Sequence, residues 1–382
     1  MKGGSPPTGQ SWTGASVLKR IVAHNGTPFI GGGELWTIRL LKELARRGHD
    51  VEMWVRDRDV REQVRAFGIP AEVAHLGGQL MIPEAVALAF KLRRNPPDAL
   101  LLTTFKKSWL GSLGGRLANV PRVVVRIGLS SDLPRRSWTY RVALRRWVDV
   151  VVTNSRSVRD EVLRDLPEVP EGRVRTVWNG VEIPERVQRG LLRQKLGLGL
   201  EIPLVGSAGR MIGNKRHDRL IQAVSGLNGV HCVLAGDGAE RGALEELCRS
   251  TGCANRVHFL GHRQDLAALM SDLDAYVVPS DLEGMSNAML EAMAVGVPVV
   301  STRVSGATDA LEPFADGQVP GVIVPPDALA IRSCLSELLG DPSRRARMSK
   351  AAIRRVRERF DAQARADEWE ALLFGPLTNP PT

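Results

Sequence analysis

The sequence of 382 residues predicts an α/β protein made of two Rossmann-like domains, each built on a doubly wound parallel sheet. Three observations lead to this prediction. The chain is longer than the size at which a single hydrophobic core usually stops growing. Short runs of β-branched residues alternate with helical patterns, which is typical of a parallel sheet covered by helices. The alternation ends and then begins again, so we expect domains at residues 17–185 and 186–360, followed by a C-terminal helix and tail at 361–382.

In the first domain, the segment Glu34–Arg47 shows the helical pattern clearly. Leu35, Ile38 and Leu41 lie on one face, and Gly48 follows the basic last turn, as expected at the C-terminus of a helix. Residues 1–16 are rich in glycine, serine, proline and threonine and are expected to form a disordered tail. The strands predicted in this domain are Leu18–His24, Asp50–Val55, Ala99–Thr103, Arg122–Ile127 and Val148–Thr153.

A turn and linker are expected at Val177–Pro184, because the segment contains Asn179-Gly180 and ends in proline. The last segment, Ala351–Leu373, is expected to be helical, and its Phe360 and Trp369 could pack back on either domain. The strands predicted in the second domain are Pro203–Ala208, Val230–Ala235, Arg256–Leu260, Ala275–Val278 and Val297–Ser301.

Composition excludes several classes of protein. The longest apolar runs are too short to cross a bilayer, and no pattern typical of a secretory signal opens the chain. The four cysteines show no zinc-ligand spacing, so we expect buried thiols without disulfides, as in a reducing cytoplasm.

The positive charge is concentrated in the first half of the chain. Residues 1–188 contain 30 Lys and Arg against 19 Asp and Glu, whereas residues 189–382 contain 22 against 23. Such an imbalance indicates an anionic partner. The segments Arg135–Trp147 and Lys106–Trp109 combine basic and aromatic residues, so they could lie on an anionic membrane; the alternative is an ordinary solvated helix face with Leu144 and Trp147 in the core. Nucleic acid is not expected, because no nucleic-acid-binding motif appears.

Two glycine-containing loops could bind an anionic ligand. The first, Gly31-Gly32-Gly33, lies between a strand and a helix, where free backbone N–H groups attract anions; a tight turn without a ligand is the alternative. In the second, Gly209-Arg210 and Lys215 follow a buried strand, at the sheet edge where open α/β folds bind ligands. Two cations there could neutralise a diphosphate, although two solvated loop charges would look the same.

Two carboxylates follow the strand Ala275–Val278. Glu283 lies in the loop and Glu291 in the next helix, separated by Gly284-Met285-Ser286-Asn287 at the helix start, where N–H groups favour an anion. A carboxylate in the loop can bind sugar hydroxyls, and one on the helix can bind a ribose. The alternative is two exposed charges, but Met289–Val300 is almost wholly apolar, so Glu291 needs a partner there.

These motifs, in this order, resemble the retaining glycosyltransferases of family 4, the group 1 glycosyl transferases, which have the GT-B fold of two Rossmann-like domains facing across a cleft. The resemblance extends over about the whole chain, and the spacing of Glu283 and Glu291 is its most specific part. Further segments carry it: Thr153-Asn154-Ser155, Asn179-Gly180-Val181, Leu234–Gly238, Phe259–Asp265 and Pro279–Gly284.

The resemblance implies a role for each site residue. Arg210 and Lys215, with Gly209 beside them, would clamp the diphosphate, and Glu283 would bind the donor sugar and Glu291 the ribose. The backbone of Gly284, Met285, Ser286 and Asn287 would face the sugar and phosphates. Gly32 and Gly33 would close over the donor, and His262-Arg263 would contact the base. The implied reaction moves a hexosyl group from a nucleotide sugar, with a UDP-sugar favoured over a GDP-sugar, to a cell-envelope glycan or lipid-linked acceptor. It proceeds by front-face substitution, without a metal or other cofactor.

The sequence departs from the family pattern at three places. Where many relatives have a histidine after the fourth strand, this chain has Arg126 and Gly128, and Arg126 could instead bind an anionic acceptor. Ser286 replaces a common proline, and Asp309 a common glutamate. Two alternatives to a transferase stay open: a sugar-nucleotide epimerase of the same fold, and a non-catalytic protein that binds sugar nucleotides.

Overall fold

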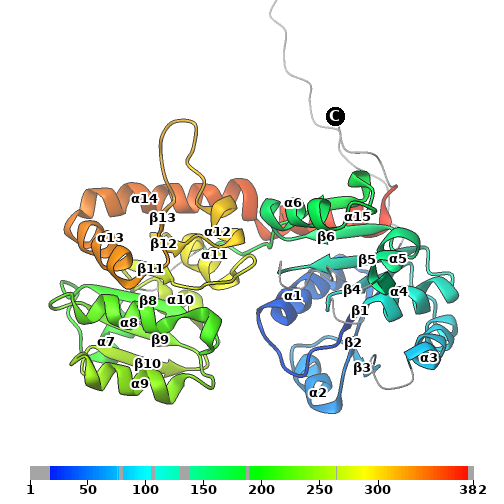
Figure 1. Ribbon diagram of the computed structural model, residues 1–382, viewed down its shortest axis with the longest axis horizontal. Helices are drawn as coiled ribbons and strands as arrows, with labels where there is room; N and C mark the ends of the chain where they lie inside the picture. Colours follow the sequence, from blue (N-terminus) through cyan, green and yellow to red (C-terminus); the bar gives the residue numbers. More distant parts are fainter. Residues whose placement is uncertain are drawn as a thin grey trace, which may run out of the picture.

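The computed structural model describes residues 18–74, 76, 81–104, 108–129, 138–185, 189–263 and 265–376. They form two α/β domains that lie side by side, each with a parallel sheet between layers of helices (Figure 1). The prediction of two doubly wound parallel-sheet domains is therefore confirmed. The tail at 1–16, Lys106-Lys107 and Arg135–Ser137 lie outside the described residues.

The first domain has seven strands in the order β3-β2-β1-β4-β5-β6-β7. The strands are β1 Arg20–Asn25, β2 Asp50–Val55, β3 Ala71–Val73, β4 Ala99–Leu102, β5 Arg122–Ile127, β6 Val150–Thr153 and β7 Val174–Thr176. The helices are α1 Gly32–Arg46, α2 Arg58–Ala66, α3 Met81–Arg94, α4 Ser108–Leu117, α5 Trp138–Arg146, α6 Arg156–Asp165 and the short 3-10 helix η2 Glu171–Arg173.

Alternation along the strands divides the core of this domain into two layers. In β1, Ile21 and Ala23 point toward α1, α2 and α15, whereas Val22 points toward α3, α5 and α6. Both faces of the sheet are covered by apolar side chains, as expected for a buried parallel sheet.

The second domain has six strands in the order β10-β9-β8-β11-β12-β13. The strands are β8 Leu204–Ala208, β9 His231–Ala235, β10 Val257–Gly261, β11 Ala275–Val278, β12 Val299–Thr302 and β13 Gly321–Val324. The helices are α7 Leu191–Leu196, η3 Gly213–Lys215, α8 His217–Ser225, α9 Arg241–Ser250, α10 Leu266–Met270, α11 Asn287–Ala294, α12 Ser305–Ala310, α13 Ala328–Gly340, α14 Pro342–Arg355 and the short π-helix η4 Val356–Phe360. The last helix, α15 Ala362–Phe374, packs on the first domain.

The C-terminal segment differs from the single helix predicted over Ala351–Leu373. It is interrupted at Asp361, whose backbone is extended and whose side chain accepts a hydrogen bond from Ala364 N at 2.9 Å, so that α15 begins with its own N-cap. The break lets the chain leave the second domain, where Phe360 is buried, and return to the first, where Trp369 packs on Trp36 at 5.1 Å between ring centroids. The peptide at Phe360 accepts a hydrogen bond from Val181 N at 2.8 Å, so the two crossings between domains run together.

The ten predicted strands begin and end within two residues of the predicted positions, and α1 begins two residues earlier, at Gly32. Three short strands, β3, β7 and β13, were not predicted. All four cysteines are buried free thiols, and burial raises the pKa of Cys248 to about 12. None of the described helices is both long and apolar enough to cross a membrane.

Candidate active site

The loops after β8 and β9 pack backbone against backbone at the carboxyl edge of the second sheet. Gly209 N donates to Ala235 O at 2.9 Å, and Met211 N donates to Asp237 O at 2.9 Å. A Cβ on Gly236 would lie 2.0 Å from Gly209 O, so the contact requires glycine there, and Gly236 also has a φ of +135°. This packing fixes the loop that carries Arg210 and Lys215.

Lys215 and Glu283 meet across the ends of β8 and β11. The ammonium of Lys215 forms an ion pair with Glu283 Oε2, and both side chains are mostly buried. The two loops are also joined through their backbones, since Asp281 N donates to Asn214 O at 2.9 Å. The structure thus brings together two of the three predicted catalytic residues.

Two arginines, one just before α8 and one in its first turn, hold the Glu283 loop in place. Arg216 and Arg219 form ion pairs with Asp281 at 3.0 and 2.6 Å, and Arg219 Nη1 also donates to Pro279 O at 3.1 Å. Arg216 adopts a left-handed conformation, with a φ of 52°, to make its contact. Sequence reasoning missed this pair; the only local signal is Lys-Arg-His-Asp-Arg at the start of α8.

Arg210 points toward the first domain. Its guanidinium stacks on Phe29 at 4.4 Å from the ring centroid, and Phe29 lies in the loop that leads to Gly31-Gly32-Gly33. The third predicted catalytic residue is therefore on the same loop as Lys215, but its side chain contacts the first domain.

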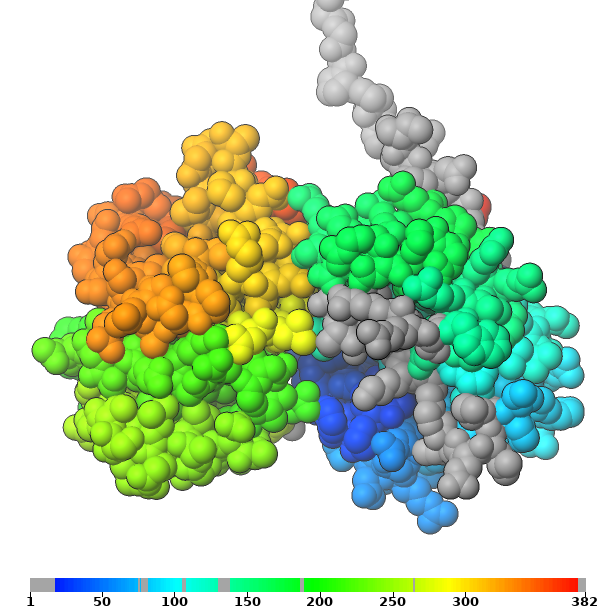
Figure 2. Space-filling view, viewed as in Figure 1, coloured from blue at the N-terminus to red at the C-terminus, as the bar shows by residue number. Residues whose placement is uncertain are grey.

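Glu291 has a partner, as its apolar surroundings require. Arg39 Nη2, from α1 of the first domain, donates to Glu291 Oε1 at 2.7 Å, while the Glu291 side chain is only 10% exposed. Arg39 is half exposed, so the pair lies at the rim of the interface between the domains. On the face shown in Figure 2, the blue segment of the first domain borders the second domain.

The start of α11 carries further contacts between the domains. Asn287 Nδ2 donates to Gly32 O at 2.9 Å, and Asn179 Nδ2 donates to Met285 O at 3.2 Å. Ser286 is the N-cap of α11, because its hydroxyl accepts from Met289 N at 3.3 Å. Serine in place of proline thus keeps the helix start.

Gly284 makes the closest approach in this interface. A Cβ at Gly284 would lie 2.0 Å from the carbonyl oxygen of Gly128 and 2.8 Å from the side-chain nitrogen of Asn154. At Gly33, by contrast, a Cβ would meet nothing within 4 Å. Gly284 is therefore required by the contact, and Gly33 leaves open space.

The other two departures from the family pattern are Arg126 and Asp309. The side chains of both are buried and make contacts within the protein. Arg126 is 5% exposed, stacks on Trp36 at 3.9 Å and donates to Asn179 Oδ1 at 2.9 Å, which leaves it almost no surface for an acceptor. Asp309 Oδ2 accepts from Trp178 Nε1 at 2.7 Å and from the backbone N of Arg156 at 2.8 Å, and so joins α12 to the start of α6.

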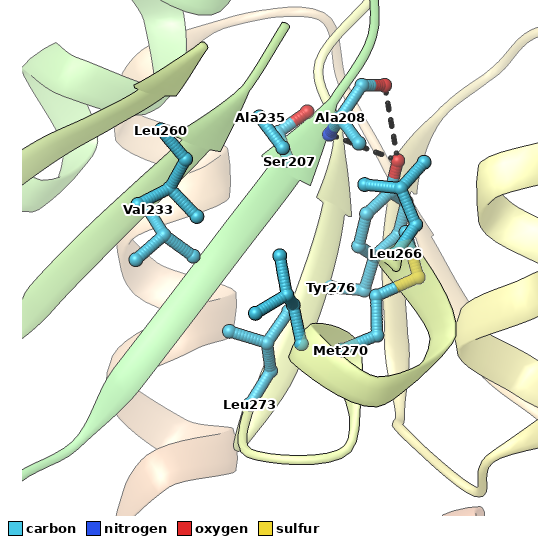
Figure 3. A pocket seen from close by; sticks show the side chains of 10 residues that line it. Ser207, Ala208, Val233, Ala235, Leu260, Leu266, Met270, Leu273 and Tyr276 are labelled. Atoms are coloured by element: carbon cyan, nitrogen blue, oxygen red, sulfur yellow. Dashed lines mark hydrogen bonds between the residues drawn. The ribbon is translucent and has the colours of Figure 1, made fainter. Parts of the chain in front are cut away.

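The predicted base-contacting segment follows β10. His262 is exposed, and Arg263 forms an ion pair with Asp265 at 2.6 Å. Beneath this segment is an apolar cavity of about 20 Å³, shown in Figure 3, with Tyr276 at one side, its hydroxyl bonded to the backbone of Ala208. A cavity of this size holds a single water at most, so the base would have to bind outside it.

The histidine next to the Lys215 loop should make stability depend on pH. His217 is buried, and its burial, with the charge of Lys215, lowers its pKa from 6.5 to about 4. Below pH 6.5 the unfolded chain binds a proton that the folded chain does not, so stability falls as the pH is lowered toward 4. The expected loss is about 2 kcal/mol near pH 5.

Denaturant unfolding at acidic and neutral pH measures this effect. We expect His217→Gln to lose less stability on acidification than the wild type, whereas His262→Gln, at an exposed position, should behave as the wild type. Equal losses in all three proteins would show that His217 does not carry the dependence.

Two models of known protein families match the sequence. Residues 30–184 match the model "Glycosyltransferase Family 4", and residues 188–355 match "Glycosyl transferases group 1". A D-inositol 3-phosphate glycosyltransferase of Xylanimonas cellulosilytica is 30% identical over 88% of this chain and 89% of its own. The chain belongs to glycosyltransferase family 4. The lipopolysaccharide core biosynthesis glycosyltransferase LpsE of Rhizobium meliloti is 28% identical over 90% of this chain and 96% of its own.

Solved structures give the same fold for this family 4 member. HepE of Anabaena, in complex with UDP, has a TM-score of 0.79 at 23% identity and covers 93% of this chain and 99% of its own. The glycosyltransferase WaaG, involved in lipopolysaccharide biosynthesis, has a TM-score of 0.71 at 17% identity, covering 94% and 100%. The GT-B fold and the activity class of glycosyltransferase, both expected from the resemblance, are confirmed.

Proposed function

We propose that this glycosyltransferase moves a hexosyl group from a nucleoside diphosphate sugar to a cell-envelope glycan or lipid-linked acceptor, with retention of the anomeric configuration. The observation that carries the proposal is the ion pair of Lys215 and Glu283 at the carboxyl edge of the second sheet. A cation for the leaving diphosphate and a carboxylate for sugar hydroxyls are thus held side by side.

Each site residue has a role in this reaction. Lys215 and Arg210 bind the diphosphate, Glu283 binds the sugar, and Glu291 binds the ribose. His262-Arg263 contact the base. Backbone N–H groups at the start of α11, from Gly284 to Asn287, face the phosphates, where the helix dipole adds positive potential.

The chemistry is front-face substitution. The acceptor oxygen bonds to the anomeric carbon on the side from which the diphosphate leaves, and the departing phosphate oxygen takes the acceptor proton. Negative charge grows on the leaving group as the bond breaks, so fixed cations stabilise the transition state more than the ground state. We propose that these cations and the helix dipole make a metal unnecessary.

The names of the relatives favour a UDP-sugar and an envelope acceptor. HepE has been crystallised with UDP and with UDP-glucose, and LpsE is named for lipopolysaccharide core biosynthesis. A GDP-mannose-dependent mannosyltransferase of Mycolicibacterium smegmatis also matches, so GDP-sugars belong in the test. Family membership favours transfer over the epimerase and the non-catalytic alternatives. We place the enzyme in the cytoplasm, where its basic first domain contacts an anionic membrane.

A panel of UDP-, GDP- and ADP-sugars, incubated with and without EDTA, tests the proposal. Slow release of free sugar to water, unaffected by EDTA and with the anomeric configuration of the donor by NMR, is the expected result. An inverted product would overturn retention, and loss of activity in EDTA would overturn metal independence. Interconversion of the sugar nucleotides would show an epimerase instead of a transferase.

The role of Glu291 can be tested separately. Glu291→Gln should raise the KM for the donor about tenfold with a smaller change in kcat, because a charge-assisted bond to the ribose is weakened. Arg39→Ala removes the partner of Glu291 but keeps the carboxylate, so its donor KM should not rise. A rise of similar size in both variants would instead indicate that the ion pair serves only the interface.

A further inference from the structure

Helix α3 exposes a row of large apolar side chains on the outer side of the first domain. Ile82, Val86 and Phe90 are 63%, 39% and 60% exposed. They are spaced four residues apart and so lie along one face of the helix. Large exposed apolar side chains grouped in this way usually mark an interaction site.

The opposite face of α3 packs against the core of the first domain. Leu88 and Leu92 are buried against the sheet and α4. A Cβ on Gly114 of α4 would lie 2.7 Å from a methyl group of Leu88, so the two helices pack in close contact. The helix α3 is therefore held firmly by its inner face, and its outer apolar face remains exposed to solvent.

The apolar row continues onto the elements on either side. Lys91 Nζ donates to Val73 O in β3 at 3.3 Å, and Arg93 Nη2 donates to the carbonyl of Leu117, the last residue of α4. Val73 and Leu117 are themselves 36% and 39% exposed. We call the five apolar residues together the α3 surface: Val73, Ile82, Val86, Phe90 and Leu117.

Positive charge accompanies this surface. The last turn of α3 carries three basic residues, Lys91, Arg93 and Arg94, and the helix has one acidic residue, Glu84, in its first turn. Lys91 is ion-paired with Glu72 of β3, so the excess positive charge of the helix comes from Arg93 and Arg94. In Figure 1, α3 lies on the side of the first domain that faces away from the second, so the surface is away from the contacts between the domains.

We propose that the α3 surface docks the enzyme on an anionic lipid bilayer. Apolar side chains on one helical face would enter the boundary between headgroups and acyl chains, and the basic residues would attract the anionic headgroups. A second copy of the chain is disfavoured, because pairing two α3 surfaces would bring like charges together. The inference rests on the proposed lipid-linked acceptor, and it assigns membrane contact to α3 instead of the predicted segment Arg135–Trp147, whose Leu144 is buried.

Sedimentation with vesicles tests the proposal. The wild type should bind vesicles of equal parts phosphatidylcholine and phosphatidylglycerol, less so at high salt, and should bind phosphatidylcholine alone weakly. The double variant Ile82→Ser/Phe90→Ser should bind the anionic vesicles at least about tenfold more weakly. The double variant Leu200→Ser/Leu329→Ser, which changes two similarly exposed apolar residues of the second domain, should bind as the wild type.

Two further measurements separate the possible failures. Release of sugar from the donor in water should be the same in the α3 variant as in the wild type, so loss of vesicle binding with full hydrolysis supports docking alone. A wild type that ignores anionic vesicles, or an α3 variant that binds them unchanged, would overturn the proposal whatever the transferase assay shows. A wild-type dimer that the α3 variant converts to a monomer, seen by light scattering, would assign the surface to a second copy instead.

Discussion

Replacing Lys215 by alanine is expected to lower kcat by about a hundredfold to a thousandfold, the cost typical of removing one group that stabilises developing negative charge. Lys215 is held beside Glu283 and lies over Gly209, where a Cβ would be 3.7 Å from its Cε atom. Its ammonium is thus fixed before the donor binds, so little reorganisation is needed as the diphosphate leaves. The KM for the donor should change less than kcat, because the added charge appears only in the transition state.

Steady-state kinetics with the best donor of the panel measures this effect. Lys350→Ala, which removes an exposed lysine of α14, is the matched control and should have wild-type kcat. Because Lys215 and Glu283 are ion-paired, the double variant Lys215→Ala/Glu283→Gln should lose less than the product of the two single losses. A change confined to KM, or a loss of kcat smaller than about tenfold, would contradict the assignment.

The parts of the site that depend on local sequence could be predicted. Gly209, Lys215 and Glu283 each follow a buried strand, and the carboxyl ends of parallel strands meet at one edge of a sheet, so their proximity follows from the alternation of strands and helices. Resemblance to the family then suggested their roles. The strands β3 and β7 were missed because runs of three residues carry little periodic signal. The strand β13 was missed because it begins with a glycine and lies between Pro320 and Pro325, a pattern typical of a loop.

Contacts between the domains could not be predicted in the same way. The partner of Glu291 is Arg39, which lies 252 positions earlier on a helix whose residues read as an ordinary amphipathic pattern. The sequence indicates that Glu291 needs a partner, because it lies in an otherwise apolar stretch. The identity of that partner depends on how the two domains are placed relative to each other. The break at Asp361 was hidden for a similar reason, because helix-forming residues continue on both sides of it.

Replacing Gly284 by alanine is expected to lower kcat/KM by about a hundredfold, the cost that a misplacement of about 1 Å at a reacting centre can bring. The added Cβ would overlap the Gly128 carbonyl, 2.0 Å away, and both partners are backbone atoms that cannot rotate aside. The two domains must therefore separate at this point, which moves Gly32 and Phe29, the stacking partner of Arg210, away from Lys215. Gly128→Ala is the matched control and should cost far less, since its Cβ would lie 3.3 Å from Arg126 and 3.6 Å from the side-chain nitrogen of Asn154, with no overlap like that at Gly284.

Nucleotide affinity distinguishes a change in domain placement from a local defect. Most of the residues proposed to bind the donor belong to the second domain, so Gly284→Ala should bind UDP or GDP nearly as the wild type by calorimetry while losing turnover. Small-angle scattering should show a more open molecule, because the same Cβ that blocks the reaction keeps the domains apart. If the variant turned over normally with an unchanged scattering profile, the Gly128–Gly284 contact would not belong to the reacting conformation. The roles proposed for Gly32 and Arg210, which depend on that arrangement, would then have to be assigned to a different closed state.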